Sequence, residues 1–168
     1  NNPLEMCCRG VASFADQLLR SRNNIALTVY GSRTATVHLG RGETQLFRIL
    51  TALADAKAEG ELPLKLVIQD LLPYIPSGSP IILFSALDND PSLAEAFTLA
   101  LTRGYALTVV SPSSIDFEAA TGRIPVGPET VARMERENMV TELRGWGVHI
   151  GDWKPGEPVN MALAGAQR

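Results

Sequence analysis

Two continuous apolar runs, at residues 79–87 and 105–111, flank a helical pattern that ends at Gly104. Apolar strands without polar alternation are typical of a parallel sheet that is covered on both faces, and the helix between them supplies the crossover. This strand–helix–strand unit predicts the α/β class. A chain of 168 residues fits one domain, so a single domain spanning residues 1–168 is expected.

The rest of the chain continues the alternation of strands and helices. A tight turn at residues 31–33 joins two expected strands, at 25–30 and 34–39, and such a short turn makes them an antiparallel pair. The predicted fold is therefore a Rossmann-like, mostly parallel sheet with helices on both faces and one antiparallel edge strand, at 34–39. The other expected elements are helices at 3–20, 42–60, 64–72, 93–103 and 129–144, a strand at 148–153 and a helix from Pro158.

The helix expected at 129–144 combines apolar positions with charges of alternating sign. Apolar residues at helical spacing are expected to face the core, and alternating charges are typical of a solvated face. The inward positions are expected to be Val131, Met134, Val140 and Leu143, and the solvated positions Arg133, Glu135, Arg136 and Glu137.

Open sheets of this class bind ligands where the carboxyl ends of the strands lead into loops. The loops at that edge carry hydroxyls, carboxylates and one aromatic side chain, a composition that suits recognition of a partner. The candidate binding residues are Gly31, Ser32, Ser85, Asp88, Asp90, Ser111, Ser113, Asp152 and Trp153.

Magnesium is the cofactor that such oxygen donors would hold if enough of them converged. Only Asp88 and Asp90 lie close together on one loop, and two carboxylates are too few for a six-coordinate site. No bound metal is therefore expected. The two acids are expected to cap the helix that starts near Ser92, because acidic side chains stabilise a helix N-terminus.

Several segments of the chain resemble a known family. Residues 23–31 (NNIALTVYG) and 40–45 (GRGETQ) resemble the sequence pattern of domain of unknown function 58, most closely in its archaeal-type members. That family is similar to von Willebrand factor A domains. The resemblance implies a Rossmann-like sheet, a protein-interaction role and a possible partner in a MoxR-type AAA ATPase, and often a membrane segment elsewhere in the full gene product. Further resembling segments are 76–80, 103–105, 110–112 and 152–155.

The chain also departs from the factor A pattern. The metal motif Asp-x-Ser-x-Ser is absent, residues 60–64 lack the expected threonine, and Ala86 stands where an aspartate usually follows Ser85. The central first strand of a factor A sheet has no counterpart in the sequence. Because a bare apolar edge invites aggregation, residues upstream of Asn2 or another segment are expected to fill that position.

Composition excludes several other classes. The net charge is −3 and basic residues are not clustered, so nucleic acid is not expected as a partner. The longest apolar runs are far shorter than the roughly 20 residues of a membrane span. Cys7 and Cys8 are adjacent in an expected helix, where they cannot bridge each other, and Cys8 is expected in the core. A cytoplasmic location, or the cytosolic face of a membrane, follows.

The sequence favours a non-enzymatic protein-interaction module. The alternative is a small-ligand or nucleotide-binding α/β enzyme that uses the same loops, and a purely structural assembly domain comes third. No nucleophile elbow or P-loop occurs, and neither His38 nor His149 has metal-ligand spacing. Trp146 and Trp153 are expected to pack, with Trp153 as an alternative exposed anchor. The acids that an enzyme would depend on are Asp88, Asp90, Asp116 and Asp152.

Overall fold

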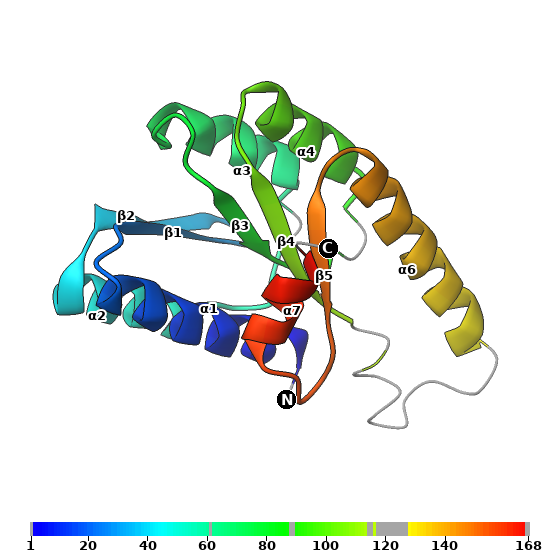
Figure 1. The fold of residues 1–168 in the computed structure, drawn as a ribbon, viewed down its shortest axis with the longest axis horizontal. Helices are drawn as coiled ribbons and strands as arrows, with labels where there is room; N and C mark the ends of the chain where they lie inside the picture. The colour runs from blue at the N-terminus through cyan, green and yellow to red at the C-terminus, as the bar shows by residue number, and fades with distance from the viewer. Residues whose placement is uncertain (1, 61, 88–89, 114–115, 117–127, 167–168) are drawn as a thin grey trace. The chain divides into compact units, whose positions relative to one another are not determined.

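The computed structural model describes residues 2–60, 62–87, 90–113, 116 and 128–166 of the chain. The fold is mixed α/β, with a two-stranded antiparallel sheet and a three-stranded parallel sheet (Figure 1). Contacts divide the chain into two compact units, which meet in sequence between Leu62 and Pro63. Each unit is described by itself, and the single domain stays a prediction. No helix of the described residues is both long and apolar enough to span a bilayer.

The first unit is a strand pair covered by two helices. It contains α1 (Pro3–Arg20), β1 (Ile25–Tyr30), β2 (Thr34–Gly40) and α2 (Gly42–Ala54). Antiparallel pairing of β1 with β2 confirms the predicted turn at residues 31–33. The two helices pack against each other and against the strands, as Figure 1 shows. Helix α2 is shorter than the sequence predicts.

The core of the first unit lies between the strand pair and its two helices. Ala15, Leu19 and Ile49 are buried there, whereas Leu50, next to Ile49 on α2, is 43% exposed. The hydroxyls of Thr28 and Thr36 lie 3.3 Å apart across the strand pair, at an exposed position. The partly buried residues that complete this core are Ile25, Leu27, Val37, Leu46 and Leu53.

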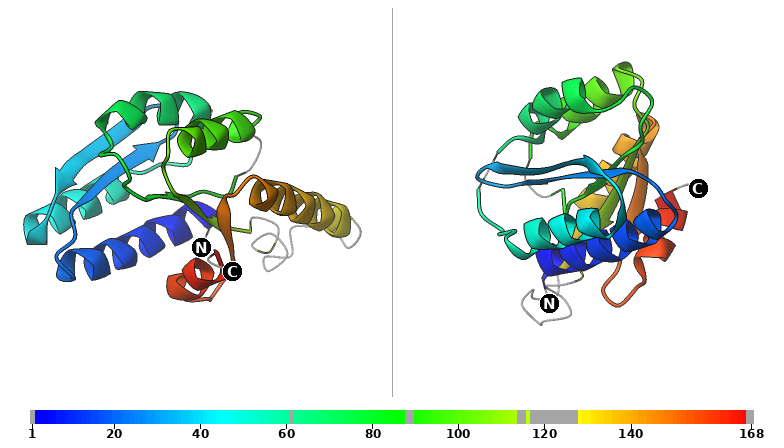
Figure 2. Two further views of the ribbon diagram at one scale, coloured as in Figure 1. Left: turned by 45° about the horizontal axis from the view of Figure 1, so that its top comes forward. Right: turned by 90° about the vertical axis from the view of Figure 1, so that its left-hand side faces the viewer.

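The second unit is built on three parallel strands in the order β3-β4-β5. Their parallel pairing confirms the predicted strand–helix–strand unit. Helix α4 packs against the central strand, and α7 packs against β4 and β5 (Figure 2). The elements of this unit are α3 (Leu64–Leu71), η1 (Leu72–Tyr74), β3 (Ile81–Phe84), α4 (Leu93–Thr102), β4 (Leu107–Pro112), α6 (Pro128–Gly145), β5 (His149–Trp153) and α7 (Val159–Ala166).

Close packing fixes α7 against the sheet. A Cβ atom added at Gly151 of β5 would lie 2.0 Å from the carbonyl oxygen of Ala162, so no larger residue fits there without moving α7. On the same face, the rings of Phe84 and Trp153 meet edge to face with centroids 6.3 Å apart. This face of the sheet is therefore a packed interior.

Helix α6 has a different inward face from the one that the sequence predicts. Val140 and Leu143 are buried as expected, but Val131 is 57% exposed and Met134 is 58% exposed. The predictions for these two residues are wrong. Arg136, expected on the solvated face, has a side chain that is only 9% exposed. The reason is the phase of the helix: positions 136, 140 and 143 share one face, and positions 131 and 134 lie nearly opposite.

The sequence also predicts a long irregular connection at residues 112–127. Most of that segment lies outside the described residues, although β4 reaches Pro112 and Asp116 is described. Helix α6 then covers the predicted range with one extra residue at each end. The end of β4 and the amino-terminal half of α6 carry polar side chains of the candidate site.

Candidate binding edge

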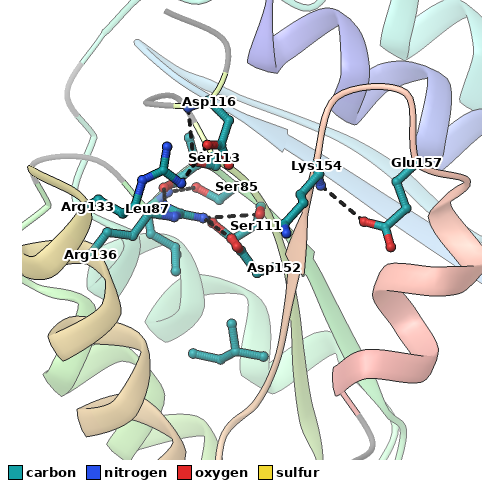
Figure 3. Close-up of polar contacts among 12 residues, drawn as sticks. Ser85, Leu87, Ser111, Ser113, Asp116, Arg133, Arg136, Asp152, Lys154 and Glu157 are labelled. Carbon is teal, nitrogen blue, oxygen red and sulfur yellow. Dashed lines mark hydrogen bonds and ion pairs between the residues drawn. The ribbon is translucent and has the colours of Figure 1, made fainter. Parts of the chain in front are cut away.

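The carboxyl ends of the three parallel strands converge on one arginine side chain. The Arg136 guanidinium on α6 donates to the Ala86 carbonyl at 3.2 Å, just beyond the end of β3. It also donates to Ser111 of β4, to the carbonyl at 3.1 Å and to the hydroxyl at 2.9 Å. Its fourth acceptor is the carboxylate of Asp152 on β5, at 2.9 Å. These acceptors on Ala86, Ser111 and Asp152 are called the oxygen notch (Figure 3).

Register explains why the oxygen notch forms. Ser111 pairs with Asp152 in the β4–β5 ladder, so their side chains project from the same face of the sheet. Phe84 pairs with Val110, which brings the residues after β3 to the same edge. Three strands that end together thus present carbonyl, hydroxyl and carboxylate oxygens at one point.

Burial strengthens the hydrogen bonds of Arg136, and it also means that its charge needs a counter-charge and each of its N–H groups needs an acceptor. Its side chain is 9% exposed and Ser111 is fully buried, whereas the Asp152 side chain is 41% exposed. A guanidinium stays charged in proteins, so the Asp152 carboxylate compensates for its removal from water. Among the described residues, the Arg136 Nε–H is a buried donor without an acceptor. An unsatisfied buried donor costs about 1–3 kcal/mol, so the fit is incomplete.

A second arginine of α6 makes a neighbouring ion pair. Arg133 lies 2.8 Å from Asp116, whose side chain is 18% exposed. The backbone N–H of Asp116 donates to the hydroxyl of Ser113 at 3.2 Å. Ser113 is itself buried, so its hydroxyl holds the loop rather than facing a partner. The amino-terminal half of α6 is thus tied to the loop after β4 by charge.

The loop after β3 contains a strained residue. Leu87 has a φ of 61°, a left-handed conformation that non-glycine residues adopt rarely. Its N–H donates to the Ser85 hydroxyl at 3.2 Å and its side chain is buried. The Arg136 contact to Ala86 holds the preceding peptide. Such strain costs about 1–3 kcal/mol and persists only where neighbouring groups fix it.

Asp90 is a helix-capping residue. One carboxylate oxygen accepts the N–H of Leu64 at 2.8 Å, and the other accepts both the N–H and the hydroxyl of Ser92. Partial burial opposes ionisation of Asp90, but the hydrogen bonds from Ser92 and Leu64 outweigh it and hold the pKa of the carboxyl below its usual value. Asp90 thus accepts the N–H of the first residue of α3, whereas before α4 it binds Ser92, the residue that precedes the helix, and no described side chain caps α4 itself. Asp88 lies outside the described residues.

The oxygen donors of this edge that the structure describes do not fit a magnesium ion in the arrangement observed. Both oxygens of Asp90 accept hydrogen bonds from the chain, and the oxygen notch is taken by Arg136. A guanidinium and a divalent cation cannot share the same oxygens, because the two charges repel each other. Within the described ranges, no group of three or more His, Cys, Asp or Glu side chains lies together.

The remaining candidates have structural contacts. Gly31 and Ser32 belong to the first unit, where a Cβ at Gly31 would lie 2.6 Å from the carbonyl oxygen of Glu59. Trp153 is 4% exposed, and its indole N–H donates to the Glu157 carbonyl at 2.7 Å. Trp153 therefore packs in the interior, and the alternative prediction of an exposed anchor at this residue is wrong.

The two cysteines are half-buried free thiols on α1. Burial and the adjacent Cys8 raise the pKa of the Cys7 thiol to about 12. Burial also raises the pKa of Cys8, whose thiol lies 3.8 Å from the Leu53 carbonyl oxygen. The raised pKa values disfavour the thiolate form, which is the form that redox and metal chemistry uses.

Sequence reasoning missed Arg136, the residue that organises the edge. The sequence does contain a signal for Arg136, namely its spacing from the apolar residues of the helix. Val140 and Leu143 lie four and seven residues after Arg136, so all three share one face of the helix. A charge on the inward stripe of a helix indicates a buried ion pair. The charges around Arg136 instead suggested a solvated face.

Comparison with known proteins leaves the edge to be interpreted from its own geometry: no protein-family model, no curated protein and no solved structure matches the chain.

Proposed function

We propose that this chain is a non-enzymatic protein-interaction module of von Willebrand factor A type, related to domain of unknown function 58. Its partner binds at the carboxyl edge of the β3-β4-β5 sheet without a metal ion. One observation carries the proposal: the Arg136 guanidinium bonds to residues from the ends of all three strands, so a side chain of the chain itself supplies the positive charge at this edge.

The topology supports the Rossmann-like part of the proposal. Three strands that follow one another in sequence pair in parallel in the same spatial order, with α4 and α6 as the intervening helices. In open sheets of this kind the carboxyl ends of the strands are where ligands bind. The resemblance in the sequence adds a MoxR-type AAA ATPase as the partner to test first.

The engagement of the acidic residues argues against the enzyme alternative. A catalytic acid or base needs a carboxyl that is free to exchange a proton with substrate. Asp90 accepts three hydrogen bonds as a helix cap, whereas Asp116 and Asp152 are each paired with an arginine. The described acids at this edge are therefore engaged with groups of the chain itself.

We place the module in the cytoplasm or on the cytosolic face of a membrane. The support is the pair of free thiols on α1, because unpaired cysteines are common where the compartment is reducing.

The test is direct binding of the purified chain to a MoxR-type AAA ATPase, measured by biolayer interferometry without nucleotide. Binding is expected to be equal in EDTA and in magnesium chloride of matched ionic strength. Asp152→Ala is expected to weaken binding at least about tenfold, since it removes an exposed acceptor at the edge.

Glu142→Ala is the matched control, because it also removes an exposed carboxylate, but from the carboxyl-terminal part of α6 and not from the oxygen notch. Loss of binding in EDTA, or equal binding by the Asp152 and Glu142 variants, would contradict the proposal. A chelator-sensitive interaction would mean that a metal ion takes part. Equal variants would mean that the partner contacts another surface.

A further inference from the structure

The oxygen notch is complementary to a guanidinium group in both shape and charge. The Ala86 carbonyl accepts from Nη1 of Arg136, and the Ser111 carbonyl, the Ser111 hydroxyl and the Asp152 carboxylate accept from Nη2, so the acceptors engage both terminal nitrogens of the planar group. The carboxylate balances a single positive charge. An ammonium group has a single nitrogen and cannot occupy both the Nη1 and the Nη2 positions, so it would leave either the Ala86 carbonyl or the Ser111 and Asp152 acceptors without a donor.

The present occupant is held mainly by polar contacts. In the carboxyl-terminal half of α6, buried Val140 and Leu143 anchor the helix in the core of its unit. In the amino-terminal half, Val131 and Met134 are exposed, and Arg133 and Arg136 make ion pairs with other described residues. Arg136 can therefore leave the oxygen notch while the second half of α6 stays packed.

The fit of Arg136 also leaves room for a better occupant. Its Nε–H has no acceptor within the described part of the chain, although the side chain is nine-tenths buried. An arginine that enters from outside the chain is free of the constraint that α6 imposes on the position of Arg136. Such a side chain can bring all of its donors to acceptors or to water.

We propose that the oxygen notch is a recognition site for an arginine side chain, which Arg136 fills in cis in competition with an arginine of the protein partner. The inference rests on the proposed function in one respect, that the partner is a protein. It adds the chemistry of the partner: an exposed arginine. A group tethered in cis has an effective concentration in the millimolar range or higher, so free ligand binds measurably only when Arg136 is removed.

The first experiment uses Arg136→Ala and the probe methylguanidinium chloride at millimolar concentration. Thermal unfolding is expected to show a saturable rise in Tm of about 5 °C for Arg136→Ala near saturation and no rise for the parent chain. Methylammonium at the same concentration is the chemical control and is expected to have no effect. Arg144→Ala is the matched control variant, because Arg144 is another α6 arginine that donates to a backbone carbonyl, that of Ile150.

The double variant Arg136→Ala/Asp152→Asn is expected to lose the methylguanidinium effect, since the counter-charge is gone. If Arg136→Ala does not fold, Arg136→Gln keeps a polar side chain of similar length and replaces it. No specific effect of methylguanidinium on the folded variant would overturn the proposal. A rise in Tm with magnesium but not with methylguanidinium would overturn it as well, because the oxygen notch would then be a metal site.

The second experiment separates this inference from the proposed function. If the partner presents an arginine, Arg136→Ala removes its competitor, and partner affinity is expected to rise about tenfold or more over the parent chain. Partner binding that is unchanged by Arg136→Ala would overturn the competition and leave the proposed function standing. Absence of any partner binding, with methylguanidinium still bound by Arg136→Ala, would overturn the proposed function alone.

Discussion

In each unit of the molecule a helix side chain binds two backbone carbonyls at or next to the strands, but the two side chains differ in charge. In the first unit, Gln45 of α2 donates to the carbonyls of Ile25 and His38 at 2.6 and 2.7 Å. In the second unit, Arg136 of α6 donates to the carbonyls of Ala86 and Ser111. Both arrangements leave one buried polar atom without a partner among the described residues, Gln45 Oε1 and Arg136 Nε.

The difference in charge and enclosure between Gln45 and Arg136 indicates which of the two contacts can be exchanged for a contact with another molecule. Gln45 is neutral and 1% exposed, and it binds at a break in the β1–β2 register that frees strand carbonyls. A Cβ at Gly40 would lie 2.5 Å from its side-chain oxygen, so the amide is tightly enclosed. Arg136 needs the counter-charge of Asp152, which is partly open to water. The neutral contact is structural, and the charged contact can exchange its partner.

The largest expected effect follows removal of the neutral contact. Gln45→Leu leaves the carbonyls of Ile25 and His38 buried without donors, and the free energy of unfolding of the first unit is expected to fall by about 3–4 kcal/mol. Urea titration followed by circular dichroism measures it. Because no charge is involved, the loss is expected to be the same in low and high salt. A loss below about 1 kcal/mol would mean that water replaces the amide.

Removal of the charged contact is expected to cost less. Arg136→Met is expected to lower the free energy of unfolding by about 2–3 kcal/mol, since Asp152 becomes rehydrated at the surface. In the Asp152→Asn background the same substitution is expected to cost less, because the counter-charge is already gone. A double-mutant cycle in urea measures this coupling. Zero coupling would contradict the ion pair as the centre of the oxygen notch.

A smaller effect is expected at Asp90, a carboxylate that serves as a cap and not as an exchangeable partner. Asp90→Ala is expected to cost about 1–2 kcal/mol at neutral pH. Because its folded pKa is lowered, the stabilisation is complete above the unfolded pKa near 3.8 and is lost as pH falls through the folded pKa. The difference between parent and variant is therefore expected to shrink below pH 4. A difference that stays constant down to pH 2 would contradict this role.

The smallest effect concerns the thiols of the first unit. Since the pKa of Cys7 is raised to about 12, its alkylation by iodoacetamide at pH 8 is expected to be at least about tenfold slower than that of an unfolded control peptide. Mass spectrometry of the alkylated peptide measures the rate. Equal rates in the folded chain and the peptide would show an accessible thiolate, and the first unit would then carry reactive chemistry.

Local pattern predicted much of the fold and little of the site. The turn at 31–33 and the limits of α6 followed from the sequence, because they depend on neighbouring residues. The role of Gln45 did not, since it depends on strand carbonyls that only the tertiary fold brings near α2. The inward position of Arg136 was hidden by surrounding charges that resemble a solvated face. Ser111 and Asp152 were correctly placed at one edge, but their partner was not predicted.

The most direct measurement is NMR of the arginine side chains in a uniformly ¹⁵N-labelled sample, with the Arg136 signals assigned by their loss in Arg136→Lys. Bound in the oxygen notch, the terminal N–H groups of Arg136 are expected to exchange slowly with water and to rotate slowly about their bond to Nε, in EDTA and in magnesium alike. Arg144, on the same helix, serves as the internal comparison. Rapid exchange and free rotation at Arg136, or release of the guanidinium when magnesium is added, would contradict the placement of Arg136 in the oxygen notch.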